Sequence, residues 1–174
     1  MTADRVNDIA CRSCGSRGLE TILSLGEQPL ANALRPLDEA EAPEPRFPLD
    51  VMFCTACSLA QLAVSVPPSV LFEEYPYFSS YSDTVVTNAS ELVERLMGEY
   101  ALDGADLAME IASNDGYLLR HYQRCGVPVL GVDPAENVAA VAVAHGVPTR
   151  CEFFDLSLAE ELRDADQRAS VLHA

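Results

Sequence analysis

Hydrophobic and polar positions follow two different patterns along the chain. Before residue 82 there is no long helical pattern, and residues 47–53 and 59–64 predict two strands that flank a tight turn. A proline- and acid-rich stretch within residues 34–48 predicts a solvated loop, and Pro67 with Pro68 predicts a hinge. We therefore expect a small β-rich module over residues 1–66.

From residue 82 onward, helical and strand patterns alternate. Ser82 or Asp83 is a candidate N-cap for a helix that ends at residues 103–104. Ser157 and Glu160 have the spacing of a capping box for a later helix. Strands are predicted at residues 107–112, 127–132, 147–151 and 169–174, with helices between them.

This alternation predicts an α/β fold with a Rossmann-like parallel sheet over residues 105–174, after a linker and helix over residues 67–104. A parallel sheet is normally covered on both faces, yet no helical pattern follows the last strand. We therefore expect the sheet to be incomplete and the domain to continue beyond Ala174.

Composition limits the classes of protein to consider. The chain has 174 residues, 49% of them hydrophobic, but no uncharged apolar run of the about 18 residues that a membrane span requires. Its first residues lack the basic and apolar segments of a signal peptide, so we expect a cytoplasmic protein with no membrane partner. The net charge of −16 would repel a phosphate backbone, which argues against a nucleic-acid partner.

Four of the six cysteines form two Cys-x-x-Cys pairs: Cys11 with Cys14, and Cys54 with Cys57. Two such pairs supply the tetrahedral set of four thiolates that zinc prefers, with no open coordination position. The alternatives are redox chemistry, which needs only one pair at a helix start, and a rubredoxin-like iron. The spacing predicts a structural Zn²⁺ in a zinc-ribbon-like module. We expect the other two cysteines, Cys125 and Cys151, to be buried as small apolar residues.

The predicted strand at residues 107–112 runs into a turn of small residues and then a helix, and open α/β sheets bind ligands at such a crevice. A dinucleotide site would have three glycines here, but only Gly116 is present. Glu110, Asn114 and Asp115 would repel or crowd a pyrophosphate. The turn therefore favours a positively charged ligand without phosphate, such as S-adenosylmethionine (SAM).

Asp133 ends the next predicted strand, where a carboxylate can bind both hydroxyls of a ribose. Alternatively, Asp133 and Pro134 form only the N-cap of a helix. Phe153 and Phe154 follow the third strand and can flank an adenine ring, or they are ordinary core aromatics. Taken together, these positions fit the nucleotide site of a class I methyltransferase.

Three longer motifs add a family resemblance to the cysteine pairs. They are Leu-Gly-Glu-Gln-Pro-Leu-Ala-Asn at residues 25–32, Phe-x-x-Tyr-Pro-Tyr-Phe-Ser-Ser-Tyr-Ser at residues 72–82 and Glu-Ile-Ala-Ser-Asn-Asp-Gly-Tyr-Leu-Leu at residues 110–119. This combination resembles the zinc-containing, SAM-dependent sugar C-methyltransferases of deoxysugar and antibiotic biosynthesis. Members of that family methylate a carbon next to the keto group of a nucleotide-linked, usually dTDP-linked, 4-keto-deoxysugar.

The resemblance implies a zinc module, a class I methyltransferase domain and a C-terminal domain that helps to hold the sugar nucleotide. This chain resembles the first part and roughly half of the second, so the activity of the chain alone stays open. Ala112 departs from the glycine that many methyltransferases have there. The residues expected to bind SAM are Ser79, Ser80, Glu110, Ala112, Ser113, Asn114, Gly116, Tyr117, Leu118, Asp133, Pro134, Phe153 and Phe154.

Tyr75 and Tyr77 are the candidates for contact with the reacting sugar or the cofactor, because a tyrosine can donate to an oxyanion or relay a proton. The alternative is that this aromatic segment only packs the zinc module against the methyltransferase domain. We assign no general base within the chain and expect it beyond Ala174. A competing hypothesis for the whole chain is a zinc-ribbon interaction module with a non-catalytic Rossmann-like half. An NAD-dependent oxidoreductase is disfavoured by the missing glycines.

Overall fold

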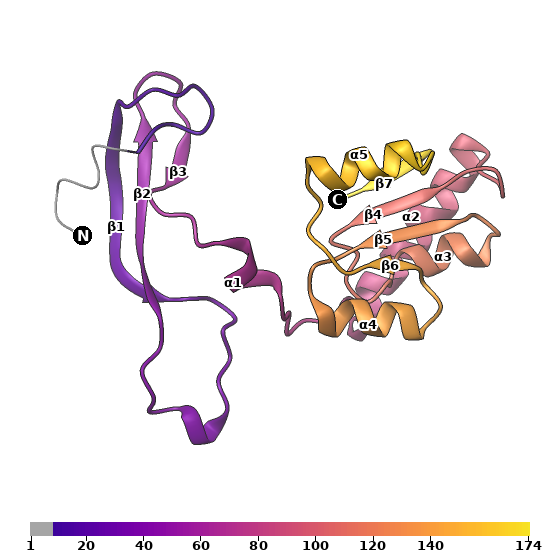
Figure 1. Cartoon of the computed structure of the whole chain (residues 1–174), viewed down its shortest axis with the longest axis horizontal. Coiled ribbons are helices and arrows are strands. Elements are labelled where there is room, and N and C mark those ends of the chain that lie inside the picture. Colours follow the sequence, from indigo (N-terminus) through magenta and orange to yellow (C-terminus); the bar gives the residue numbers. More distant parts are fainter. Residues whose placement is uncertain (1–8) are drawn as a thin grey trace. The chain divides into compact units, whose positions relative to one another are not determined.

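The computed structural model describes residues 9–174 and divides the chain into two compact units, Met1–Pro67 and Pro68–Ala174 (Figure 1). Residues 1–8, which we searched for a signal peptide, lie outside the described part. Within residues 9–174, no helix combines the length and apolar character needed to cross a membrane. Each unit contains its own sheet.

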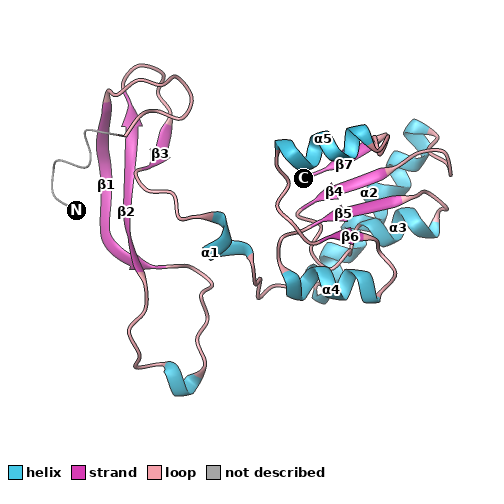
Figure 2. Ribbon diagram, viewed as in Figure 1, coloured by secondary structure: helices cyan, strands magenta, loops and turns pink. Residues whose placement is uncertain are grey.

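The N-terminal unit is a three-stranded antiparallel sheet in the order β1-β2-β3 (Figure 2). β2 (Arg46–Cys54) and β3 (Ala60–Leu62) correspond to the two predicted strands, and a loop with a short 3-10 helix, η2 (Leu37–Glu39), precedes β2. β1 (Leu19–Pro29) is a long strand that the sequence did not predict. Nearly all of its side chains are exposed, so no buried face imposes an alternation of apolar and polar positions on it.

The C-terminal unit contains a four-stranded parallel sheet in the order β6-β5-β4-β7 (Figure 1). This confirms the predicted α/β class with a parallel sheet. Its strands are β4 (Ala108–Ile111), β5 (Val129–Val132), β6 (Thr149–Arg150) and β7 (Val171–His173). Its helices are α1 (Pro68–Phe72), η3 (Ser79–Tyr81), α2 (Asp83–Tyr100), α3 (Leu119–Arg124), α4 (Glu136–Ala144) and α5 (Leu156–Asp164).

Helices cover both faces of the parallel sheet, and each face has its own apolar core (Figure 2). On one face, α2, α3 and α4 contribute buried side chains that include Ala89, Val93, Leu119, Tyr122 and Ala142. On the other face, α5 packs Leu158 and Leu162 against Met109, Leu130 and Val132. Because the sheet is buried between these layers, its accessible edge for ligands is the one formed by the strand ends.

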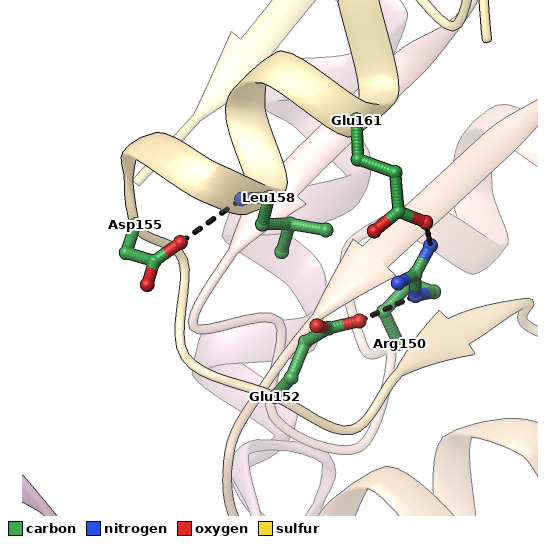
Figure 3. Close-up of polar contacts among 5 residues, drawn as sticks. All are labelled: Arg150, Glu152, Asp155, Leu158 and Glu161. Atoms are coloured by element: carbon green, nitrogen blue, oxygen red, sulfur yellow. Dashed lines mark hydrogen bonds and ion pairs between the residues drawn. The ribbon is translucent and has the colours of Figure 1, made fainter. Parts of the chain in front are cut away.

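The N-cap of α5 differs from the prediction. Asp155 is the N-cap, and its Oδ1 accepts a hydrogen bond of 2.9 Å from the backbone N–H of Leu158 (Figure 3). Ser157 lies inside the helix, so the predicted capping box of Ser157 and Glu160 is wrong. An aspartate side chain binds the free N–H groups of a first turn as well as a serine side chain does. Which of two nearby candidates becomes the N-cap depends on where the preceding loop ends.

Arg150, the last residue of β6, links the sheet to α5. Its guanidinium binds Glu152 and, at 2.9 Å, Glu161 on the helix (Figure 3). These carboxylates are largely solvated, so the pairs contribute little to stability. Glu152 and Glu161 lie on either side of Phe153 and Phe154 in the sequence, and these two phenylalanines are among the residues predicted to bind a cofactor.

Two other details also differ from expectation. Cys125 and Cys151 are exposed, not buried, because the first caps the solvent end of α3 and the second follows β6 in a loop. α2 ends at Tyr100 rather than at residues 103–104, since Ala101 takes a left-handed φ of 50° that stops the helix.

Candidate functional site

The four cysteines of the two pairs come together in the N-terminal unit. The Sγ atoms of Cys11 and Cys57 lie 3.6 Å apart, those of Cys14 and Cys54 lie 3.7 Å apart, and all four lie within 4.8 Å of one another. Four sulfurs at the usual Zn–S bond length form a tetrahedron with edges of about 3.8 Å. The cluster therefore has the donor type, number and spacing that a tetrahedral Zn²⁺ requires, with no position left for a substrate.

The backbone turns around both pairs have the same geometry. Gly15 N–H donates to the Cys11 carbonyl at 2.9 Å, and Ser58 N–H donates to the Cys54 carbonyl at 2.8 Å. Gly15 and Ser58 both follow a second cysteine and both have a left-handed φ, 72° and 62°. The backbone N–H of Cys14 is the largest cause of a lowered pKa, about 6, for the Cys11 thiol. This turn thus favours the thiolate form of Cys11. At Cys57 the backbone N–H of Leu59 acts in the same direction, but the nearby Cys14 and Cys11 sulfurs outweigh it and raise the pKa to about 12, because sulfurs this close cannot all be ionised without a cation between them.

Gln61 is a buried polar residue that ties the first pair to the sheet, and sequence reasoning missed it. Its Oε1 accepts a hydrogen bond of 2.9 Å from Arg12 N–H, and its Nε2 donates to the Ala10 carbonyl at 3.3 Å. The Arg12 guanidinium donates to the Leu62 carbonyl and to Ser65 Oγ. A single glutamine in a short strand gives no pattern in the sequence, so only the fold reveals this contact.

A pocket of about 560 Å³ opens in the C-terminal unit at the carboxyl ends of β4, β5 and β6. Its wall on the other side comes from α1 and the aromatic segment, by which we mean residues 73–81. The lining residues are Pro68, Phe72, Tyr75, Tyr77, Ser79, Ile111, Ala112, Asn114, Tyr117, Val132, Asp133, Pro134, Ala135, Phe153 and Phe154. Among the described residues, Asp133 is the one charged group in this lining, which contains no arginine, lysine or histidine.

Most of the predicted cofactor residues line this pocket, but five do not. Tyr75 and Tyr77 also line it, beside Ser79. The predicted residues outside the lining are Ser80, Glu110, Ser113, Gly116 and Leu118. The lining residues to which the sequence assigned no role in binding are Pro68, Phe72, Ile111, Val132 and Ala135. These five are small or apolar, and apolar residues at strand ends look the same in sequence whether they face a core or a pocket.

Gly116 has a packing role next to the pocket. It has a φ of 75°, and a Cβ built on it would lie 2.9 Å from Val147 Cγ2. Ala112 and Asn114, in the same turn, also have left-handed φ values, 57° and 52°. The turn therefore uses three left-handed residues within five positions to bring the backbone close to the strand end, although only one of the three is glycine.

Asp133 is held by backbone N–H groups from the turns that follow β4 and β5. Its Oδ2 accepts a hydrogen bond of 2.8 Å from Asn114 N–H, and its Oδ1 accepts one of 2.9 Å from Ala135 N–H. Ala135 is the N-cap residue of α4 and no side chain caps this helix, so the alternative in which Asp133 and Pro134 form the N-cap is wrong. Each carboxylate oxygen has a further lone pair, so the group can still accept from a ligand hydroxyl.

The side chain of Asn114 points to the aromatic segment. Its Oδ1 accepts from Ser79 N–H at 2.9 Å, and its Nδ2 donates to the Tyr77 carbonyl at 3.0 Å. Asp115 Oδ2 accepts from Ser80 N–H at 3.1 Å. The turn after β4 therefore binds the backbone of residues 77–80. The protein itself occupies the Asn114 amide and Asp115 Oδ2, whereas the buried Asp115 Oδ1 has no hydrogen-bond partner among the described residues.

Glu110 lies in the protein interior rather than in the pocket. It is 5% exposed, and its Oε2 has no hydrogen-bond partner among the described residues. Burial is the main cause that raises the pKa of Glu110 to about 8, followed by the charges of Asp133 and Asp115. Burial, and secondarily Glu110, raises the pKa of Tyr122 to about 12, and the Tyr122 hydroxyl lies 3.0 Å from His173 Nε2. Burial therefore favours the neutral form of the Glu110 carboxyl group.

Two comparisons with known proteins place the chain among its relatives. Residues 11–72 match a family model described as "Putative zinc binding domain", and they contain all four cysteines of the cluster. The chain is also 36% identical over 152 residues to the C-methyltransferase NovU of Streptomyces niveus. The resemblance to zinc-containing C-methyltransferases is confirmed. The aligned part covers 87% of this chain but 36% of NovU, so the chain spans just over a third of the length of this relative.

The chemistry of the pocket agrees with this relationship. A buried carboxylate that can accept from hydroxyls, aromatic side chains and a lining without cations suit a nucleoside that carries a positive charge and no phosphate. The aligned region includes residues from both units, since 152 aligned positions exceed either unit alone. The similarity is therefore not limited to the cysteine cluster.

Proposed function

We propose that this chain is the zinc-binding and cofactor-binding part of a SAM-dependent C-methyltransferase that acts on a nucleotide-linked, dTDP-type 4-keto-deoxysugar. The observation that carries the proposal is the cation-free pocket at the strand ends, with Asp133 in its wall, in a chain 36% identical to a C-methyltransferase. The four-cysteine cluster supports a structural Zn²⁺ bound by Cys11, Cys14, Cys54 and Cys57.

The residues of the pocket have distinct roles in this proposal. Asp133 accepts hydrogen bonds from the ribose hydroxyls, since each of its oxygens keeps a free lone pair. Phe153 and Phe154, which are 38% and 37% exposed, flank the adenine ring. Tyr75 and Tyr77 face the reacting end and donate from their hydroxyl groups to the substrate oxygen.

The reaction follows from the acidity of a C–H bond next to a ketone. A general base removes that proton, and the electron pair is delocalised onto the ketone oxygen as an enolate, which hydroxyl donors stabilise. When bound, SAM supplies a methyl group attached to a sulfonium sulfur, and the sulfur-containing remainder is the leaving group, a neutral thioether. The pocket would contribute by holding that methyl group in line with the enolate carbon, so that the new C–C bond could form as the C–S bond breaks.

Titration calorimetry with SAM tests the cofactor assignment directly. We expect binding by the wild-type chain, and about ten-fold weaker binding by Asp133→Asn, because the neutral amide is a poorer acceptor for hydroxyls. Asp164→Asn, at the exposed end of α5, is the matched control and leaves the affinity unchanged. Heat of binding with NADH but not with SAM would overturn the proposal in favour of an oxidoreductase, and binding of neither would favour an interaction module.

Transfer of a labelled methyl group tests the substrate class. With methyl-labelled SAM, we expect label on a dTDP-linked 4-keto-deoxysugar and none on the same sugar with its keto group reduced to a hydroxyl. The reduced sugar has no acidified C–H bond, so an enolate cannot form on it. Equal labelling of both sugars would contradict the enolate mechanism and indicate transfer to oxygen.

A further inference from the structure

The aromatic segment is held in place by hydrogen bonds to its backbone. Apart from η3 it has no regular structure, yet three side chains beside the pocket bind its main chain: Asn114 and Asp115 in the turn after β4, and Asn137 in the first turn of α4. The N-terminus of α4 adds another contact, because Glu136 N–H donates to the Glu73 carbonyl at 3.1 Å. The segment is therefore fixed to the turns that follow β4 and β5.

Asn137 makes the most specific of these contacts. Its Oδ1 accepts a hydrogen bond of 3.0 Å from Tyr75 N–H, and its Nδ2 donates one of 2.7 Å to the Tyr75 carbonyl. Both polar groups of the amide are thus paired with both polar groups of one residue, in the way that a neighbouring strand would pair them. The two bonds fix the position and the direction of the Tyr75 backbone.

This arrangement leaves the Tyr75 side chain free for the pocket. Tyr75 lines the pocket, and none of the hydrogen bonds in the described part of the chain uses its hydroxyl. Asn114 repeats the pattern two to four residues further on, with one bond to Ser79 and one to Tyr77. The polar groups of the backbone are satisfied by asparagines, while the tyrosine rings face the cavity.

We propose that Asn137 is a positioning residue, which acts through Tyr75 by holding its backbone so that the tyrosine ring forms part of the cofactor pocket. The inference rests on the proposed function, because it assigns Tyr75 to a pocket that binds SAM. It also changes the role expected for the neighbouring Asn114, whose amide holds residues 77–79 instead of the cofactor.

Asn137→Asp is the informative variant. It keeps the size of the side chain and one acceptor, but it places a carboxylate oxygen against the Tyr75 carbonyl in place of the Nδ2 donor. An aspartate at the second position of α4 is favourable for the helix, so a loss of function cannot be attributed to helix unfolding. Asn88→Asp, at an exposed position of α2, is the matched control.

We expect Asn137→Asp to weaken SAM binding roughly five- to thirty-fold in calorimetry, with no change for Asn88→Asp. The decisive measurement repeats the substitution in a Tyr75→Ala chain. If Asn137 acts through Tyr75, the substitution has no further effect once the ring is absent. An equal loss in both backgrounds would show a general structural role and overturn the proposal, as would unchanged affinity in the single variant.

Hydrogen exchange separates this inference from the proposed function. The Tyr75 amide should exchange at least about ten-fold faster in Asn137→Ala, which lacks the acceptor for this N–H, than in the wild type or in the control Asn88→Ala. If the wild-type chain binds no SAM, the proposed function is wrong. In that case accelerated exchange at Tyr75 would still support the positioning contact, and unchanged exchange would refute it.

Discussion

Ala112 occupies a backbone conformation that glycine adopts more easily. Its φ of 57° is left-handed, and its side chain is exposed, so its methyl group gains no burial in return. We expect Ala112→Gly to stabilise the C-terminal unit by about 1 kcal/mol, measured by urea unfolding. The control is Ala140→Gly, in the middle of α4, which should destabilise by about 1 kcal/mol. A loss of stability in Ala112→Gly would show that the methyl group makes a contact of its own.

Glu110 gives the chain a specific dependence on pH. Its pKa rises from 4.5 to about 8 on folding, mainly because of burial, so the folded state holds a proton that the unfolded state loses. The stabilisation from this proton is fully present below pH 4.5 and is lost as the pH rises through 8. We expect Glu110→Gln to be more stable than the wild type at pH 9, by about 1–3 kcal/mol.

Urea unfolding at pH 5, 7 and 9 measures this effect. The exposed Glu99→Gln in α2 is the control, and it should follow the wild-type dependence on pH. Parallel curves for Glu110→Gln and the wild type would mean that Glu110 is ionised in the folded protein. Its Oε2 would then have to find a partner that the described residues do not provide.

At the scale of elements, the start of α5 allows a direct comparison between two candidate caps. Asp155 accepts from Leu158 N–H, whereas Ser157 lies within the helix. We expect Asp155→Ala to cost about 1 kcal/mol of stability, and Ser157→Ala to change it by less than about 0.5 kcal/mol. The free energy of unfolding of both variants, from urea titrations, checks this. A larger loss for Ser157→Ala would restore the capping box that the sequence predicts.

The elements also show where sequence patterns carry information and where they do not. α2, β4 and β5 fall where periodicity places them, because each has a buried face that selects apolar residues at fixed spacing. The sequence did not predict β1 because this strand is held by backbone pairing with β2, while its side chains lie in solvent. Backbone pairing is nearly independent of side-chain identity, so it leaves little trace in a sequence.

At the scale of the whole molecule, the two units should differ in their dependence on metal. The N-terminal unit has few buried apolar residues besides the cysteines, whereas the C-terminal unit contains two apolar cores. We expect Cys54→Ser, or removal of zinc with a strong chelator, to unfold residues 9–67 and leave the parallel sheet folded. Circular dichroism with zinc quantification, and hydrogen exchange resolved by unit, measure the outcome.

Cys125→Ser is the control for this prediction, because Cys125 is exposed at the end of α3 and outside the cluster. It should retain bound zinc at one equivalent and unfold as the wild type does. A Cys54→Ser chain whose N-terminal unit stays folded without metal would contradict the structural role of the cluster. In that case the hydrogen bonds of Gln61 and the β1–β2 pairing would be sufficient for folding.

The sequence by itself determined the features that depend on residue type and spacing. Two Cys-x-x-Cys pairs specify a four-sulfur cluster, and alternating helical and strand patterns specify a parallel sheet with Asp133 at a strand end. Only the tertiary structure decided which side chains share a space. The tertiary structure places Glu110 in the interior. It also brings Asn137 against Tyr75, although these two residues are far apart in the sequence. The physical reason is that local spacing fixes the direction of a side chain within its own element, whereas its partner depends on how the elements pack.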